Sequence, residues 1–181
     1  MMDRLPELTA EDMNDAQRRI LADIQSSRGG IRGPFPWLLR SPGMADIAQQ
    51  LGAYLRYDSP LPGNLRELAI LVVARFWAAQ YEWHAHAPIA EREGVDPAVV
   101  EAIRENRRPD FVETGEEIVY DFCVGTLENH RVDDAVYGAM LNLVGDEQLL
   151  DVIAILGYYS MLAIIMGTFD VPVPGDKPLS E

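Results

Sequence analysis

Apolar residues recur along most of the chain at intervals of three and four positions, the spacing of one face of an α-helix. This pattern predicts helices over about 10–26, 42–57, 65–94, 97–105, 116–128, 133–143 and 146–169. No segment shows sustained alternation of apolar and polar residues with β-branched enrichment, which is typical of a half-buried strand. The sequence therefore predicts an all-α fold.

Polar residues suited to capping a helix mark where several of these helices begin. Thr9 is a suitable N-cap for the first helix, because its hydroxyl can accept a hydrogen bond from a free backbone N–H group. Ser41 and Asp96 are suitable caps for later helices, and each precedes a proline at the first helical position. The breaks between helices are short, so we expect a single domain over 1–181.

Composition is that of a soluble globular protein: 48% of the 181 residues are apolar and 24% are charged. The net charge of -14 disfavours binding to nucleic acids and to anionic membranes, because both carry the same sign of charge. Cys123 is the only cysteine, which excludes an intrachain disulfide. The N-terminal segment lacks the apolar stretch of a signal peptide, so we expect a cytoplasmic protein.

One segment, 152–169, has no charged residue and reaches the lower length of a transmembrane helix. Two glycines and a central Tyr-Tyr-Ser interrupt it, and aspartates rather than cations flank it. A helix that is apolar on all sides is otherwise buried in a core or between subunits. We therefore expect this helix to be buried and the protein to be a homo-oligomer.

The segment 80–87, QYEWHAHA, carries the most concentrated candidate chemistry. Glu82 and His86 are four residues apart and share one helix face, so the pair can exchange a proton with a substrate near neutral pH. The same spacing also occurs in plain surface pairs. His84 points elsewhere on the helix and His130 is distant in sequence, so we expect no metal site.

Two arginines are candidates for binding a substrate carboxylate. Arg75 is the only charge in the apolar run 68–79, where it needs a partner: either a structural ion pair or a ligand. Arg56 lies near the end of a predicted helix, where it can contact terminal carbonyls or face a pocket.

The segment 65–95, LRELAILVVARFWAAQYEWHAHAPIAEREGV, resembles the carboxymuconolactone decarboxylase family, which includes the alkylhydroperoxidase D-like proteins. GPFPWLL, AYLR and the ending GYYSMLAIIMGTFDVPVP are similar to the longer members, so the resemblance covers most of the chain. It implies a helical bundle with a helix-turn-helix core over about 45–130, an extra N-terminal helix, and assembly as a trimer or hexamer.

The peroxidase branch of this family uses a glutamate, eleven residues, Cys-x-x-Cys, three residues and a histidine. Counted from Glu67, the two cysteine positions are Ala79 and Glu82, and the histidine is His86. Without a thiol pair, dithiol-dependent reduction of peroxides is not expected. The decarboxylase branch lacks the cysteines and has a glutamate and a histidine that match Glu82 and His86.

The resemblance implies a lyase or isomerase that needs no cofactor and acts on a small carboxylated lactone or a related aromatic-catabolism intermediate. His86 would transfer the proton, Glu82 would be its partner, and Glu67 would be a second carboxylate. On one straight helix Glu67 would lie about 22 Å from Glu82, so the family's turn near Ala79 is needed to bring them together. A non-catalytic oligomer that binds a small molecule and a structural subunit with a decayed site are the alternatives.

Overall fold

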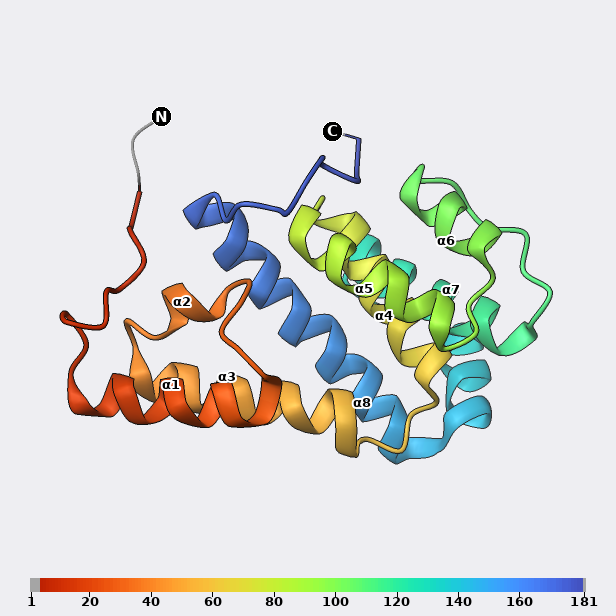
Figure 1. Ribbon diagram of the computed structural model, residues 1–181. Helices are drawn as coiled ribbons and strands as arrows, with labels where there is room; N and C mark the ends of the chain where they lie inside the picture. Colours follow the sequence, from red (N-terminus) through yellow and green to blue (C-terminus); the bar gives the residue numbers. More distant parts are fainter. Residues whose placement is uncertain (1–3, 181) are drawn as a thin grey trace.

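The computed structural model describes residues 4–180, apart from the side chains of residues 27 and 28, and this part of the chain is helical without a strand. The predicted all-α class is confirmed. Helix α4 packs against α5, α6, α7 and α8, whereas α1 and α2 pack against α3 on the other side of α8 (Figure 1). Their bounds are α1 Asp15–Arg28, α2 Phe35–Leu38, α3 Pro42–Ala53, a π-helical turn η1 Tyr54–Asp58, α4 Gly63–Phe76, α5 Gln80–Arg92, α6 Pro97–Arg104, α7 Thr114–Asn129 and α8 Asp134–Phe169.

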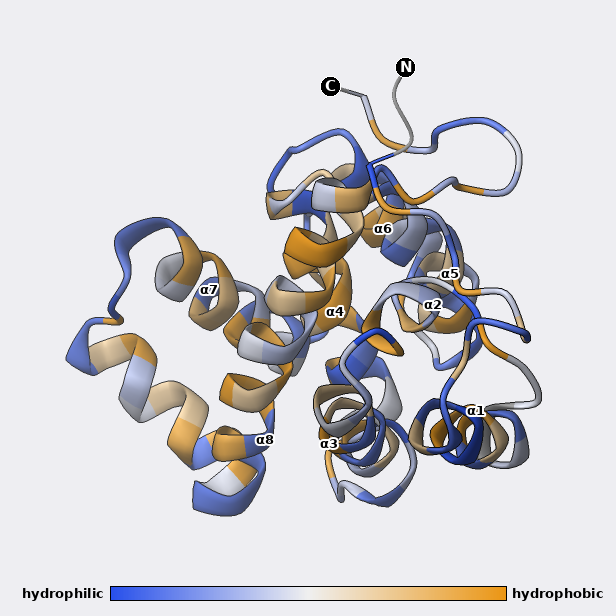
Figure 2. Ribbon diagram, turned by 90° about the vertical axis from the view of Figure 1, so that its left-hand side faces the viewer, coloured by the Kyte–Doolittle hydropathy of each residue, from blue (hydrophilic) through white to orange (hydrophobic). Residues whose placement is uncertain are grey.

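The central position of α4 follows from its sequence. Its residues from 67 to 74 are all buried, and apolar side chains face every direction around the helix. Such a helix is stable only when neighbours cover all its sides. Helices α5, α7 and α8 provide this cover, and the apolar residues of α4 lie in the middle of the molecule (Figure 2).

Helix α1 begins later than the sequence pattern predicts. Its N-cap is Asn14, whose side chain accepts from the Gln17 backbone N–H, while the Gln17 side chain accepts from the Asn14 backbone. The prediction of Thr9 as the N-cap was wrong, because its hydroxyl donates to Asp12 in a turn that precedes the helix. The reciprocal bonds of a capping box satisfy two free backbone donors, which a lone threonine does not.

Helix α8 joins the two helices predicted over 133–143 and 146–169. Gly145 interrupts it with non-helical angles, φ 77° and ψ 178°, so the two halves differ in direction. By length and composition this is one helix that could span a membrane, with a mean hydropathy of 2.1 over its most apolar window. However, 56% of that window is buried inside the protein, as in the core helix of a soluble domain.

A buried carboxylate anchors the π-helical turn to α8. Asp151 accepts hydrogen bonds from the Ser59 hydroxyl, at 2.5 Å, and from the Tyr54 hydroxyl, at 3.2 Å. Within the turn, the Ser59 N–H donates to the Tyr54 carbonyl, five residues earlier, at 2.8 Å. Single π-turns of this kind are frequent at functional sites, and this one carries Arg56.

Helices α4 and α5 form the predicted helix-turn-helix. The chain reverses over 77–79, where Ala78 adopts a left-handed conformation with φ 49°. The Ala79 N–H donates to the Ala74 carbonyl, which closes the turn at 2.8 Å. Because α5 folds back onto α4, Glu67 in α4 comes next to residues of α5 that follow it by more than fifteen positions.

Residues 171–180 form an extended segment, here called the C-terminal strap, that runs from the end of α8 past α5 (Figure 1). Leu179 is buried in the core, with 3% of its surface exposed. The Gln80 side-chain amide donates to the Leu179 carbonyl and accepts from the Leu179 N–H, at 3.0 and 2.9 Å. The strap is thus held at the first residue of α5.

Candidate active site

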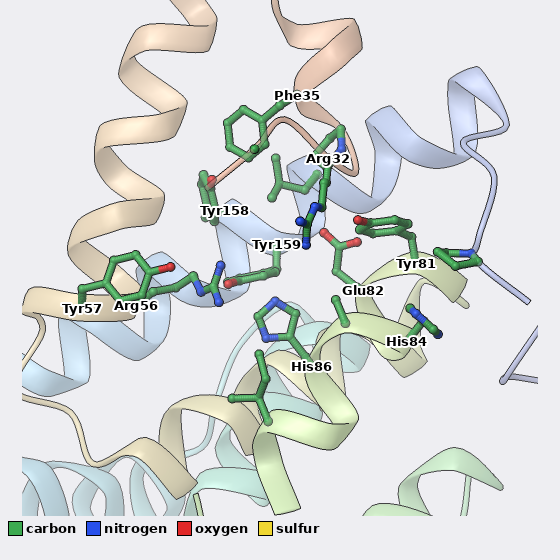
Figure 3. A pocket seen from close by; sticks show the side chains of 16 residues that line it. Arg32, Phe35, Arg56, Tyr57, Tyr81, Glu82, His84, His86, Tyr158 and Tyr159 are labelled. Atoms are coloured by element: carbon green, nitrogen blue, oxygen red, sulfur yellow. The ribbon is translucent and has the colours of Figure 1, made fainter. Parts of the chain in front are cut away.

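A cavity of about 630 Å³ lies among α5, α8, η1 and the loop that precedes α2. This volume is typical of sites for small molecules. Figure 3 shows that ionisable and aromatic side chains from these separate elements point toward one space. The ionisable and aromatic side chains that line the cavity are Arg32, Phe35, Arg56, Tyr57, Tyr81, Glu82, His84, His86, Tyr158 and Tyr159.

His86 is held by a carboxylate from the neighbouring helix. Its Nδ1 lies 2.7 Å from Glu67 Oε2, and both side chains are buried. Burial raises the pKa of Glu67. The hydrogen bond and charge of His86, together with Arg66, lower it by more than burial raises it, so the pKa is below the usual range. Glu67 is therefore an anion at neutral pH.

Arg66 completes the support of this carboxylate, because its Nε lies 3.3 Å from Glu67 Oε1. With one oxygen taken by Arg66 and the other by His86, Glu67 cannot rotate freely. A carboxylate at Nδ1 fixes the orientation of an imidazole and favours a proton on Nδ1. The lone pair then resides on Nε2, and His86 lines the cavity.

Glu82 is a second buried carboxyl group with a different environment. It is 3% exposed and lines the cavity, and among the described residues its Oε2 has no hydrogen-bond partner. Burial raises its pKa to about 8, although a hydrogen bond from its own backbone opposes this effect. At neutral pH Glu82 is mainly a neutral acid that can donate a proton into the cavity.

The structure brings Glu67, Glu82 and His86 into one site, but it exchanges the roles expected for the two glutamates. The hydrogen-bonded partner of His86 is Glu67, and within residues 4–180 no hydrogen bond joins Glu82 to His86. The spacing of four residues placed Glu82 and His86 on one face correctly. The fold-back of α5 then supplies a closer partner from α4, which intrahelical spacing could not reveal.

Arg56 and Tyr159 form another wall of the cavity (Figure 3). The Arg56 guanidinium lies 5.2 Å from the Tyr57 ring centroid, and the Tyr159 ring meets His86 edge-on at 5.1 Å. Burial raises the pKa of Tyr159 well above its usual value, although the charge of Arg56 opposes this. The Tyr159 hydroxyl thus stays protonated, and Arg56 faces the cavity, which is one of the two positions that the sequence left open.

Arg75 does not enter this cavity. It lines a separate cavity of about 60 Å³, and its Nη1 donates to the Ser180 carbonyl at 3.1 Å. Arg75 lies in the last turn of α4, where its side chain reaches the C-terminal strap instead of α5. The structure therefore separates Arg75 from Arg56, and of these two arginines only Arg56 lines the main site.

Several residues of the cavity were not predicted from the sequence. Arg32 comes from the loop before α2, and Tyr81 is a direct neighbour of Glu82 on α5. The Tyr158–Tyr159 pair was seen only as an interruption of an apolar run, although polar hydroxyls in such a run are a signal of a pocket wall. Nothing in the local sequence of Arg32 indicates its position, because a long-range packing contact sets it.

The remaining reactive residues lie apart from the Glu67–His86 pair. His84 is exposed at the cavity wall, and His130 ends α7 in a left-handed conformation with φ 60°. Cys123 is fully buried, and burial raises the pKa of its thiol. In the part of the chain that the structure describes, no three His, Cys, Asp or Glu side chains gather as a metal site would require.

Comparison with known proteins shows a family similarity in the middle of the chain. Residues 42–111, which contain the α4–α5 helix-turn-helix, match the model of the carboxymuconolactone decarboxylase family. The matched region is similar to this family, and the chain as a whole has an alkylhydroperoxidase D-like fold. A comparison with curated proteins gives no match. The family and the cavity together indicate an enzyme that acts on a small molecule.

Solved structures with this fold cover nearly the whole chain at low identity. The AhpD-core, peroxidase-related protein of Ralstonia eutropha JMP134 is 19% identical, with a TM-score of 0.76 over 97% of this chain and 93% of that one. A peroxidase-related protein of Silicibacter sp. TM1040 is 14% identical, with a TM-score of 0.77 over 97% and 92%. The debrominase Bmp8 in its apo form is 16% identical, with a TM-score of 0.73 over 95% and 92%.

Proposed function

We propose that this protein is a lyase or isomerase that acts by proton transfer, without a cofactor, on a small carboxylated lactone or a related ring acid. One observation carries the proposal: the cavity holds a His86 ring fixed by Glu67 beside a protonated Glu82. An imidazole that can accept a proton and a carboxylic acid that can donate one are the two groups that such chemistry needs.

In the decarboxylation, Arg56 binds a substrate carboxylate that is retained. The carbon–carbon bond to the other carboxylate breaks, and its electron pair moves into the conjugated lactone carbonyl as CO2 leaves. Glu82 then delivers its proton to the ring carbon and is reprotonated through His86 Nε2, which takes a proton from solvent. In an isomerisation, His86 Nε2 removes a proton from one carbon while Glu82 supplies one to another, so no electrons are gained or lost.

Peroxide reduction with dithiols does not fit this site. Ala79 and Glu82 stand at the two positions where the peroxidase branch has cysteines. Cys123 is buried in the core on α7, and its raised thiol pKa keeps it unreactive.

The test is turnover of a carboxymuconolactone, followed by CO2 release and by the change in ultraviolet absorbance. We expect His86→Gln to lower kcat about 10²- to 10⁴-fold with little change in ligand affinity, because it removes the proton-transfer group. His130→Asn is the control, since His130 lies at the end of α7 and asparagine tolerates its left-handed conformation.

Two results would contradict the proposal. The first is a native protein that binds the lactone but does not convert it, which is the behaviour of a non-catalytic binding protein. The second is a folded His86→Gln variant with native kcat, which would show that the Glu67–His86 pair is structural only.

A further inference from the structure

The loop between α1 and α2 contributes a wall of the cavity that the proposed chemistry does not use. Its Arg32 guanidinium extends into the cavity above Glu82, and the Tyr81 ring lies on the other side of Glu82 (Figure 3). Both residues therefore border the group that we assign as the acid.

Gly33 explains why this loop reaches so close. Its φ is +60°, and a Cβ at this position would lie 2.8 Å from Tyr81 Cε1, closer than real side chains approach. Only glycine permits this conformation and this contact without strain. The loop is thus fitted against the Tyr81 ring, and this contact fixes Arg32 at the cavity wall.

The charges of the cavity indicate an anionic occupant. Within residues 4–180, Arg32 and Arg56 form no ion pair, whereas five other arginines pair with carboxylates: Arg18, Arg66, Arg104, Arg107 and Arg108. The chain has 29 acidic residues, so partners are abundant elsewhere. Guanidinium groups left unpaired beside a cavity are suited to a carboxylate, which they bind with two parallel hydrogen bonds.

The shape of the occupant follows from the aromatic side chains. Four of the seven tyrosines of the chain line this one cavity, at positions 57, 81, 158 and 159, together with Phe35. Aromatic walls favour flat, conjugated rings, because stacked and edge-on ring contacts add to the burial of apolar surface.

We propose that Arg32, Gly33 and Tyr81 form a subsite for a flat, conjugated ring that carries an anionic group: Tyr81 packs against the ring and Arg32 binds the anion. This inference rests on the proposed function, because it names the class of substrate that Glu82 and His86 would act on. It assigns to the α1–α2 loop the selection of an aromatic or unsaturated ring acid over a saturated one.

The experiment measures by calorimetry the affinity of three probes of similar size. These are 4-hydroxybenzoate, its neutral amide 4-hydroxybenzamide, and the saturated trans-4-hydroxycyclohexanecarboxylate. Native protein should bind 4-hydroxybenzoate about tenfold more tightly than the amide, since a hydrogen bond to a charged group is worth about 1.5–3 kcal/mol. It should also prefer the aromatic acid several-fold over the saturated one.

Two variants separate the charge from the ring contact. Arg32→Gln should reduce 4-hydroxybenzoate affinity about tenfold and leave amide affinity unchanged. Tyr81→Leu should remove the preference for the flat ring and keep the preference for the anion. Arg92→Gln is the control, because it removes the same charge from an exposed position on α5 outside the cavity. Circular dichroism confirms the fold of each variant.

The outcomes are separable from those of the proposed function. Lactone turnover and probe binding are both measured in the native protein, so absence of turnover with intact probe preferences would refute the chemistry and leave the subsite standing. Equal binding of all three probes, or no binding of any, overturns the subsite. So does a result in which Arg56→Gln, and not Arg32→Gln, removes the preference for the anion.

Discussion

Glu67 and Glu82 are both buried carboxyl groups of the same site, yet they differ in charge at neutral pH. Glu67 has two cationic or donor neighbours that outweigh its burial, and its pKa is lowered. Glu82 has only its own backbone donor against burial, and its pKa rises to about 8. One site thus holds an anion that orients the histidine and an acid that can give up a proton.

The raised pKa of Glu82 predicts how stability depends on pH. Unfolded Glu82 ionises near 4.5, whereas folded Glu82 keeps its proton up to about 8. Between these values the folded state binds the extra proton, so the stability of the native protein falls as pH rises, by about 1.4 kcal/mol per unit at most. Below pH 4.5 this loss is absent.

Glu82→Gln should remove that slope. Its free energy of unfolding, measured in urea from pH 5 to 8, should exceed the native value by a margin that grows with pH. The difference between the two proteins isolates Glu82, because every other titrating group is common to both. A constant difference across this range would show that Glu82 is ionised in the folded state.

Which site residues could be read from the sequence depended on how far apart their partners lie. The spacing of Glu82 and His86 was enough to place them on one face, and the family resemblance added Glu67. Arg32 and Arg75 show the limit. Arg32 lines the cavity because its loop packs on Tyr81. Arg75 lies outside the cavity and donates to the Ser180 carbonyl. Both positions depend on contacts distant in sequence.

Elements with local signals were predicted, and those that depend on backbone geometry were not. Asp96 with Pro97 begins α6 as expected, with the Asp96 carboxylate accepting from the Ala98 N–H at 2.7 Å. The break at Gly145 was expected as a gap between two helices and is present as a kink within α8. The left-handed turn at Ala78 has no local signal, since alanine rarely adopts it.

The C-terminal strap should contribute to stability although it is not helical. Leu179→Ala should lower the free energy of unfolding by about 2 kcal/mol, because a buried leucine is replaced by a cavity. Denaturation in urea measures this loss. The control is Val112→Ala, whose side chain is 88% exposed and whose loss should cost little. If the two variants are equally stable, the strap is not part of the folded core.

At the scale of the whole molecule, several large apolar side chains are exposed on α3 and α8. Ile47 on α3 is 68% exposed, and Leu150 and Ile153 on α8 are 65% and 46% exposed. The hydrogen bond from Tyr54 to Asp151 joins α8 to η1, the turn that follows α3. Exposed apolar side chains on joined elements are typical of an interface, and a second copy of the chain is the occupant that we expect from the predicted homo-oligomer.

Light scattering tests this expectation. The native protein should have a mass of three or six times 20.2 kDa, in keeping with a trimer or hexamer. Leu150→Glu should shift the mass toward that of one chain, because a charge in a buried interface is costly. Val112→Glu should leave the mass unchanged. A native mass near that of one chain at micromolar concentration would refute the assembly.

The π-helical turn also constrains insertions and deletions. Between the Tyr54 carbonyl and the Ser59 N–H the chain contains one residue more than an α-helical turn holds. Loss of any single codon within 54–58 would let α3 continue as an ordinary helix. Side chains after the deletion would keep their direction, because the five residues of the π-turn cover about the same rotation as four in an α-helix. The residues within the turn would shift by part of a turn, so a deletion that leaves Glu67, Glu82 and His86 untouched would still move Arg56 relative to them.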